Sequence, residues 1–165
     1  MHRRNRSGLN FTASANRSPS MTIQRERWLL DTNVWIFGLR REDGFPACAR
    51  LLDRIGSCSI LIPLQVLKEL NLTLAPDELR EFYQFINRYP EYIELSWEPA
   101  PLERVSFYEQ RGCRKGDAVI AAHAEAMDVR IIVSENRQFL QTLEDSKVNI
   151  LTAAQANARL ADQSS

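Results

Sequence analysis

Asp31, Glu69 and Asp117 are three acidic residues that lie within or beside apolar stretches of the sequence. Asp31 breaks the stretch WLLDTNVWIF, residues 28–37, where apolar residues stop at Asp31 and then resume. A buried carboxylate without a partner is costly, so Asp31 either caps a helix or faces a cation. If the three acids lay about 5 Å apart, each pair would repel by about 3 kcal/mol at an effective dielectric constant of about 20. Such a cluster must take up protons or bind a cation, and its oxygen ligands suit Mg²⁺ or Mn²⁺ rather than zinc.

The two more distant acids also have simpler interpretations. Glu69 lies in IPLQVLKEL, nearly two helical turns after Pro63, on a partly apolar face shared with Val66 and Leu72 or Thr73. It could instead be a surface acid that pairs with Lys68. Asp117 lies in RKGDAVIAAHAEA, where a carboxylate in the first turn of an apolar helix is favoured by the helix dipole alone.

The elements that must position these acids alternate between short apolar runs and helical patterns. This alternation predicts an α/β fold, a three-layer α/β/α sandwich with a mainly parallel five-stranded sheet in the order 3-2-1-4-5. Pro63 is expected at a helix start and Thr152 as a helix cap. The expected strands are residues 28–31, 58–62, 92–97, 130–134 and 147–151. The expected helices are residues 33–40, 45–55, 64–74, 77–88, 101–111, 115–128, 136–144 and 152–161.

The predicted strand order brings polar residues together at one edge of the sheet. Parallel sheets bind ligands beyond the carboxyl ends of their strands, at the point where the strand order reverses. Asp31 ends the first strand, and Ser134 and Asn136 follow the fourth. Because these two strands are neighbours at the reversal, Asp31 and Asn136 are expected side by side.

Four sequence blocks, LLDTNVWI, IPLQVLKEL, GDAVIAAHA and IIVSENRQF, occur in this order along the chain. Over nearly all of residues 28–160 the chain resembles a PIN domain, the nuclease fold of VapC-type toxins in bacterial toxin–antitoxin pairs. The resemblance implies that Asp31, Glu69 and Asp117 are catalytic, metal-binding acids of a Mg²⁺- or Mn²⁺-dependent ribonuclease. It also implies that Asn33 and Ser134 support the site, and that cleavage leaves a 5′-phosphate and a 3′-hydroxyl.

The fourth block departs from the commonest pattern of the family. PIN domains often have an aspartate two residues after the Ser or Thr, and here that position is Asn136. An amide oxygen can bind a metal ion or orient water, but it adds no charge. A second ion would therefore be held more weakly at Asn136. The adjacent Glu135 should point to the other face of the strand end.

Basic residues give no strong overall charge but could form a local rim for RNA. The 21 Lys and Arg balance the 21 Asp and Glu, so a uniformly basic surface is excluded, whereas a local patch is not. Ordinary solvated charge is the simpler interpretation of each basic residue. The candidates for contact with RNA phosphates are Arg40, Arg114, Lys115 and Arg137.

The remaining features set the domain and the compartment. Residues 1–24 are basic and rich in Ser and Asn, which predicts a disordered extension, although Met21 could be the true start; residues 25–162 form the predicted nuclease domain. No apolar run could span a membrane, and a cytoplasmic protein is expected. The three cysteines, Cys48, Cys58 and Cys113, are expected as free thiols. His123 and Trp35 are expected in the core rather than in the site.

The predicted function is a metal-dependent ribonuclease, a VapC-like toxin with an RNA substrate, a cognate antitoxin and a homodimeric assembly. The main alternative is a catalytically weakened PIN-like module that binds RNA or protein, in which Asn136 marks decay of the site. Retention of the three acids argues against that alternative. A phosphoaspartyl phosphatase would usually carry a second aspartate two residues after the first, where this chain has Asn33.

Overall fold

The computed structural model describes residues 25–142 and 147–163, so the predicted extension at residues 1–24 lies outside the described residues. The described chain forms one five-stranded sheet in the order β3-β2-β1-β4-β5. All four strand pairs are parallel, which confirms the predicted topology. The strands are β1 Arg27–Leu30, β2 Ser59–Pro63, β3 Ile93–Ser96, β4 Ile131–Val133 and β5 Asn149–Leu151.

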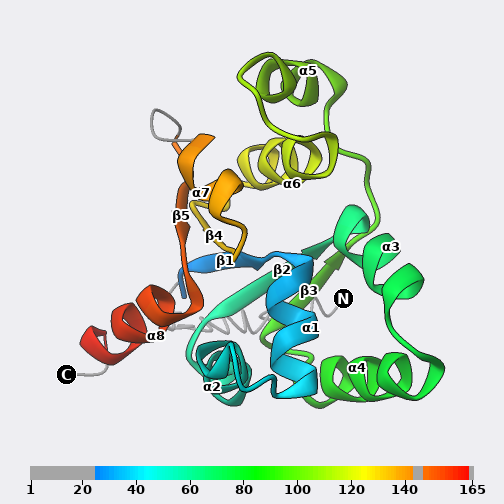
Figure 1. Ribbon diagram of the computed structural model, residues 1–165, viewed down its shortest axis with the longest axis vertical. Helices are drawn as coiled ribbons and strands as arrows, with labels where there is room; N and C mark the ends of the chain where they lie inside the picture. The colour runs from blue at the N-terminus through cyan, green and yellow to red at the C-terminus, as the bar shows by residue number, and fades with distance from the viewer. Residues whose placement is uncertain (1–24, 143–146, 164–165) are drawn as a thin grey trace, which may run out of the picture.

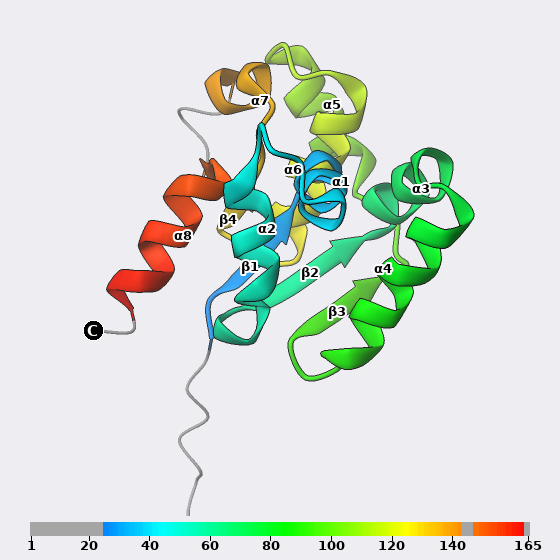
Figure 2. The same ribbon diagram turned by 60° about the horizontal axis from the view of Figure 1, so that its bottom comes forward.

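The sheet is covered on both faces by the helices that connect its strands (Figure 1). Helices α1, α2, α4 and α8 lie on one side of the sheet, and α5 and α6 lie on the other (Figures 1 and 2). The chain adds strands outward from β1 to β2 and β3, and then returns to the other side of β1 to add β4 and β5. The connecting helices therefore pass from one face of the sheet to the other after β3. The helices are α1 Thr32–Arg40, α2 Pro46–Asp53, α3 Leu64–Thr73, α4 Pro76–Arg88, α5 Leu102–Gln110, α6 Lys115–Ala126, α7 Arg137–Thr142 and α8 Ala153–Asp162.

The core lies between these layers and is centred on β1, β2 and β4. In β4 all three residues are buried, and in β2 the residues from Ile60 to Pro63 are buried, as predicted for strands covered on both faces. Trp28 of β1 and Trp35 of α1 are fully buried. The rings of Trp35 and Phe82 of α4 meet edge to face at 5.4 Å between centroids, which joins α1 to α4.

Several element boundaries differ from the sequence-based prediction. Pro63 ends β2 and takes the cap position before α3 with an extended backbone, rather than opening the helix. The helix predicted over residues 45–55 ends at Asp53, and a separate 3₁₀ turn follows at Ile55–Ser57. Thr152 does cap α8, accepting a hydrogen bond from the Gln155 amide at 3.2 Å.

The β1–β4 pair places the reversal of strand order at the centre of the sheet. Leu30 of β1 is in register with Val133 of β4, so Asp31 and Ser134 are the next residues on neighbouring strands. The Asp31 amide continues the ladder by donating to the Val133 carbonyl at 2.9 Å. In the part of the chain that the structure describes, no helix combines the length and apolarity that a membrane crossing requires.

Candidate active site

Asp31 occupies the carboxyl end of β1 and serves as the cap of α1. Its Oδ1 accepts a hydrogen bond from the Thr32 amide at 2.7 Å, and its Oδ2 accepts one from the Ser134 hydroxyl at 2.7 Å. The residue is only 5% exposed. The two interpretations of Asp31 from the sequence are therefore compatible, because one oxygen caps the helix while the other faces the end of β4.

The segment after β4 is joined to Asp31 through the Ser134 hydroxyl. Ser134 is fully buried, and its Oγ accepts a hydrogen bond from the Asn136 amide at 3.1 Å. Asn33 Oδ1 accepts from the Glu135 amide at 3.3 Å, so Asn33 also supports this turn. Asn136 is thus linked to Asp31 through the Ser134 hydroxyl.

Asn136 presents its amide nitrogen to the third acid. Its Nδ2 donates to Asp117 Oδ2 at 3.2 Å, while its Oδ1 accepts from the Gln138 backbone amide at 3.1 Å. In this arrangement the oxygen that could bind a metal ion holds the first turn of α7. The side chain of Glu135 points away, as predicted, and accepts from the Ala153 amide at 2.8 Å.

Asp117 and Glu69 approach the same region from two helices. Asp117 lies in the first turn of α6 and is half-buried. Glu69 lies in the middle of α3, where its Oε2 accepts from the Thr32 hydroxyl and its Oε1 accepts from Gln65 Nε2 at 2.7 Å. Val66 is buried as expected, but Leu72 is 88% exposed, so the predicted shared apolar face does not extend to that residue.

The electrostatics show that the three acids interact. Burial raises the pKa of Asp31 to about 6, with smaller contributions from the negative charges of Asp117 and Glu69. Hydrogen bonds from Ser134 and Thr32 oppose this rise. Burial is also the main reason that the pKa of Asp117 is raised, and the charge of Glu69 adds to it, whereas Arg114 and Asn136 act in the opposite direction.

The donor set fits a hard divalent cation, although the side chains are not arranged around one. The three acids offer only oxygen ligands, they repel one another, and none of them makes an ion pair within the described residues. Over residues 25–142 and 147–163, however, no three His, Cys, Asp or Glu side chains are placed to hold one ion together. Glu69 is turned toward Thr32 and Gln65, and Asp117 toward Asn136, so shared coordination requires side-chain rotation or bridging water.

The candidate RNA contacts divide into two groups. Arg114 is the residue before α6, Lys115 begins that helix, and Arg137 begins α7 directly after Asn136; all three are exposed. Arg40 instead ends α1, far along the helix from Asp31. Its Nε donates to Glu78 Oε1 at 2.7 Å, so its charge is already paired.

Other residues that the sequence placed outside the site do lie elsewhere. His123 is buried in α6 and its Nε2 lies 3.0 Å from the Ser96 hydroxyl at the end of β3. Cys48, Cys58 and Cys113 are free and buried. Burial raises the pKa of both Cys48 and Cys58 to about 12, so these two thiols are protonated at neutral pH.

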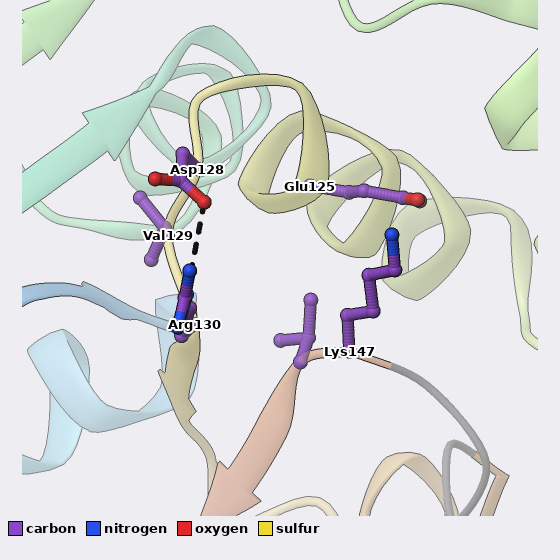
Figure 3. A pocket seen from close by; sticks show the side chains of 6 residues that line it. Glu125, Asp128, Val129, Arg130 and Lys147 are labelled. Atoms are coloured by element: carbon purple, nitrogen blue, oxygen red, sulfur yellow. Dashed lines mark ion pairs between the residues drawn. The ribbon is translucent and has the colours of Figure 1, made fainter.

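One pocket lies at the opposite end of the sheet from the acids. It has a volume of about 610 Å³ and is formed where β4 and β5 begin. Figure 3 shows Asp128 and Arg130 joined by an ion pair, with Lys147 directed toward Glu125. Opposite charges alternate here, unlike the uniformly acidic group at the carboxyl ends of the strands.

Two residues of the site were not found from the sequence. Thr32 and Gln65 hold the two oxygens of Glu69. Gln65 precedes Glu69 by four residues, a spacing at which side chains meet on a helix, so its contact was open to prediction. The contact of Thr32 depends on how α3 packs against α1, and no local pattern in the sequence specifies that.

The fold is an α/β sheet whose acids gather at the point where the strand order reverses. Comparison with known protein families identifies the family that shares this arrangement. The family model of the PIN domain matches residues 28–143. Since that match covers most of the chain, the chain belongs to the PIN-domain family, whose members are generally nucleases. No curated protein sequence matches the chain.

Three solved structures resemble the chain in fold, at identities too low to say more than that. PAE2754 from Pyrobaculum aerophilum has a TM-score of 0.53 and 16% identity over 84% of this chain and 97% of its own. VapBC2 from Rickettsia felis, bound to a DNA fragment of its promoter, has a TM-score of 0.51 and 18% identity over 76% of this chain and 98% of the VapBC2 chain. FitAB bound to the IR36 DNA fragment has a TM-score of 0.51 and 16% identity over 76% and 94%.

Proposed function

We propose that the chain is a divalent-metal-dependent ribonuclease of the VapC type, with Asp31, Glu69 and Asp117 as its catalytic acids. The observation that carries this proposal is the environment of Asp31, which is a buried carboxylate that accepts hydrogen bonds only from neutral groups and faces two further acids. Such a carboxylate gains from a cation that the chain itself does not provide.

Asp31, Glu69 and Asp117 would hold one Mg²⁺ or Mn²⁺, directly or through water. When bound, the ion would neutralise charge on the scissile phosphodiester and lower the pKa of an attacking water. Ser134 fixes one oxygen of Asp31. Asn136 fixes Asp117 Oδ2, whereas no hydrogen bond among the described residues reaches Asp117 Oδ1. Oδ1 is therefore better placed than Oδ2 to accept a proton from water.

Arg114, Lys115 and Arg137 would bind RNA phosphates at the rim of this site. All three are exposed, Arg114 and Lys115 at the start of the helix that carries Asp117, and Arg137 directly after Asn136. Such contacts position the strand without reading its bases. The products would carry a 5′-phosphate and a 3′-hydroxyl, in agreement with attack of water on phosphorus.

A cognate antitoxin and a second copy of the chain are the proposed partners. VapBC2 and FitAB, two of the similar structures, are determined as complexes bound to DNA, which supports an antitoxin for a chain of this fold. The homodimer is proposed from the resemblance to VapC-type toxins.

The test is cleavage of labelled RNA by the purified chain in Mn²⁺, with the ends of the products mapped. The proposal predicts cleavage by wild type, none in excess EDTA and none by Asp31→Asn, whose folding is checked by circular dichroism. RNA binding without cleavage by wild type would favour the alternative of a PIN-like binding module. Full cleavage by Asp31→Asn or in EDTA would overturn the assignment of these acids.

A further inference from the structure

The carboxylate of Glu69 is held at the contact between α3 and α6. Its Oε2 is bound by the Thr32 hydroxyl of α1, and its Oε1 by Gln65 Nε2 at 2.7 Å, from one turn earlier in α3. Both oxygens are therefore fixed by neutral donors. Because each carboxylate oxygen has two acceptor sites, these bonds set the direction of the group and leave lone pairs for another ligand.

Gly116 lies against this carboxylate from the side of α6. A Cβ added at Gly116 would lie 3.2 Å from Glu69 Oε1 and 3.9 Å from Gln65 Nε2. Gly116 does not have a positive φ, so its backbone does not require glycine. Glycine is a poor helix former, and a glycine in the first turn of α6 is therefore explained by close approach rather than by conformation.

Gly116 is also the residue directly before Asp117. The space that it leaves decides how near Glu69 of α3 comes to the turn of α6 that carries Asp117. Helices α3 and α6 pack against each other, so the two acids lie on neighbouring helices at this contact.

We propose that Gln65 and Gly116 are positioning residues for the metal site, because they fix the Glu69 carboxylate at a set separation from Asp117. Gln65 directs Oε1 through its hydrogen bond, and Gly116 provides the room in which that oxygen lies. This inference rests on the proposed function, and it adds that the α3–α6 contact itself sets the affinity for the ion.

The first test compares Gly116→Ala with Gly44→Ala, since a Cβ at Gly44 would meet no atom within 4 Å. Mn²⁺ affinity is measured by isothermal titration calorimetry, and the melting temperature is measured separately in EDTA. Gly116→Ala should bind Mn²⁺ about tenfold more weakly, as expected when the support of a metal ligand is disturbed. Its melting temperature in EDTA should stay the same or rise by up to about 3 °C, because alanine favours the helix and the carboxylate end can move. Gly44→Ala should keep the wild-type affinity.

The second test compares Gln65→Leu with Gln84→Leu, an exposed glutamine of α4. Both changes keep a good helix former, but only the first removes the donor to Glu69. Gln65→Leu should weaken Mn²⁺ binding about tenfold, and Gln84→Leu should not. If Gly116→Ala lost melting temperature in EDTA together with affinity, the alanine would have disturbed folding, and the Gln65 pair would then decide the question.

A third measurement tests whether Gly116→Ala weakens binding because its added Cβ meets the Glu69 carboxylate. In a Glu69→Asp background the shorter side chain withdraws from the added Cβ, so Gly116→Ala should weaken Mn²⁺ binding by less than about twofold further. Wild-type affinity in both Gly116→Ala and Gln65→Leu, or an undiminished tenfold effect in the Glu69→Asp background, would overturn the positioning role and leave the proposed function intact. A wild type that binds no Mn²⁺ would instead overturn the proposed metal site and this inference with it.

Discussion

Glu26 and Asp31 stand at opposite ends of β1, and their surroundings differ in burial and in the charge of their hydrogen-bond donors. Glu26 accepts hydrogen bonds from Arg159 at 2.7 Å and 3.0 Å, and mainly for this reason its pKa is lowered. Asp31 accepts only from Thr32 and Ser134, and burial raises its pKa to about 6. The chain thus supplies a cation to the acid at the amino end of the strand and only neutral donors to the acid at the carboxyl end.

Helix α6 repeats this difference between its two ends. Burial alone would raise the pKa of Glu125, but hydrogen bonds from Arg104, at 2.6 Å, and from Tyr108 leave it lowered. Asp117 at the other end accepts from Asn136, a neutral amide, and its pKa is raised. Glu125 also lines the pocket of Figure 3, where acids and bases alternate. Compensated acids indicate a structural role, whereas the proposed cation site lies at the acids that have no cation hydrogen-bonded to them.

The largest expected effect compares the two ends of α6. Asp117→Asn should lower the rate of Mn²⁺-dependent RNA cleavage by at least about 100-fold, because it removes charge that would hold the ion. Glu125→Gln removes an equal charge from the same helix and should change the rate by less than about twofold. Initial rates with one labelled RNA under identical conditions provide the comparison. Equal losses in both variants would show that the two ends of α6 do not differ in function.

The stability of the metal-free protein should depend on pH through Asp31. A carboxyl group with a raised folded-state pKa destabilises the fold as pH rises from its unfolded value near 4 through its folded value, about 6 for Asp31. Over two pKa units this amounts to about 3 kcal/mol at pH 7. Asp31→Asn should therefore gain up to about 3 kcal/mol over wild type between pH 4 and pH 7, as measured by urea unfolding in EDTA.

Glu26 provides the control for this pH dependence. Its pKa is lowered, so its contribution to stability is present above its unfolded value and is lost as pH falls through the lower folded value. Glu26→Gln should thus lose stability relative to wild type at pH 7 and approach wild type in acid. If Asp31→Asn showed the same direction as Glu26→Gln, the two ends of β1 would not differ as described.

A smaller effect is expected from Ser134→Ala. Ser134 is fully buried, and its hydroxyl donates to Asp31 and accepts from the Asn136 amide. Its removal should lower the free energy of unfolding by about 2 kcal/mol at pH 8, as for a hydrogen bond to a charged group, and by less at pH 4. Ser57→Ala, at an exposed serine, should change it by less than about 0.5 kcal/mol. A loss that is the same at pH 4 and pH 8 would show that Ser134 does not act through the charge of Asp31.

The smallest expected effect compares Arg114, an exposed arginine at the start of α6, with Arg40, which is paired with Glu78. Arg114→Ala, made in the inactive Asp31→Asn background, should weaken RNA binding by roughly threefold to tenfold and reduce the slope of log affinity against log salt by about 1. Arg40 is paired with Glu78, so Arg40→Ala should change the affinity by less than about twofold. Fluorescence anisotropy with a labelled single strand measures both. A larger loss from Arg40→Ala than from Arg114→Ala would place the RNA at the other end of α1.

The sequence predicted every strand and α-helix of the described chain, because the apolar runs, their lengths and their separation are local features. The strand order was predicted correctly from the doubly wound arrangement that this alternation indicates. It was less successful at boundaries. Pro63, which suits the first position of a helix, instead ends β2, since its backbone remains extended before α3. The apolar face that was predicted beside Glu69 does not include Leu72, which is 88% exposed.

The sequence predicted the acids of the candidate site but not the hydrogen bonds that connect them to their neighbours. Asp31 follows from a strand end and Asp117 from a helix start, which sequence patterns specify, whereas Glu69 was singled out by the partly apolar face of its helix. The Thr32–Glu69 contact and the bond between Asn136 and Asp117 depend on the packing of separate helices. The role of Gly116 against Glu69 Oε1 likewise required the position of α6 relative to α3.

The most direct test of the central claim is the melting temperature of wild type and Asp31→Asn as Mn²⁺ is added at pH 8. A ligand that binds only the folded state stabilises it by an amount that grows with its concentration over its Kd. Mn²⁺ should raise the melting temperature of wild type progressively and leave that of Asp31→Asn almost unchanged. An equal rise in both proteins, or no rise in wild type, would contradict the proposed role of Asp31 in holding the ion.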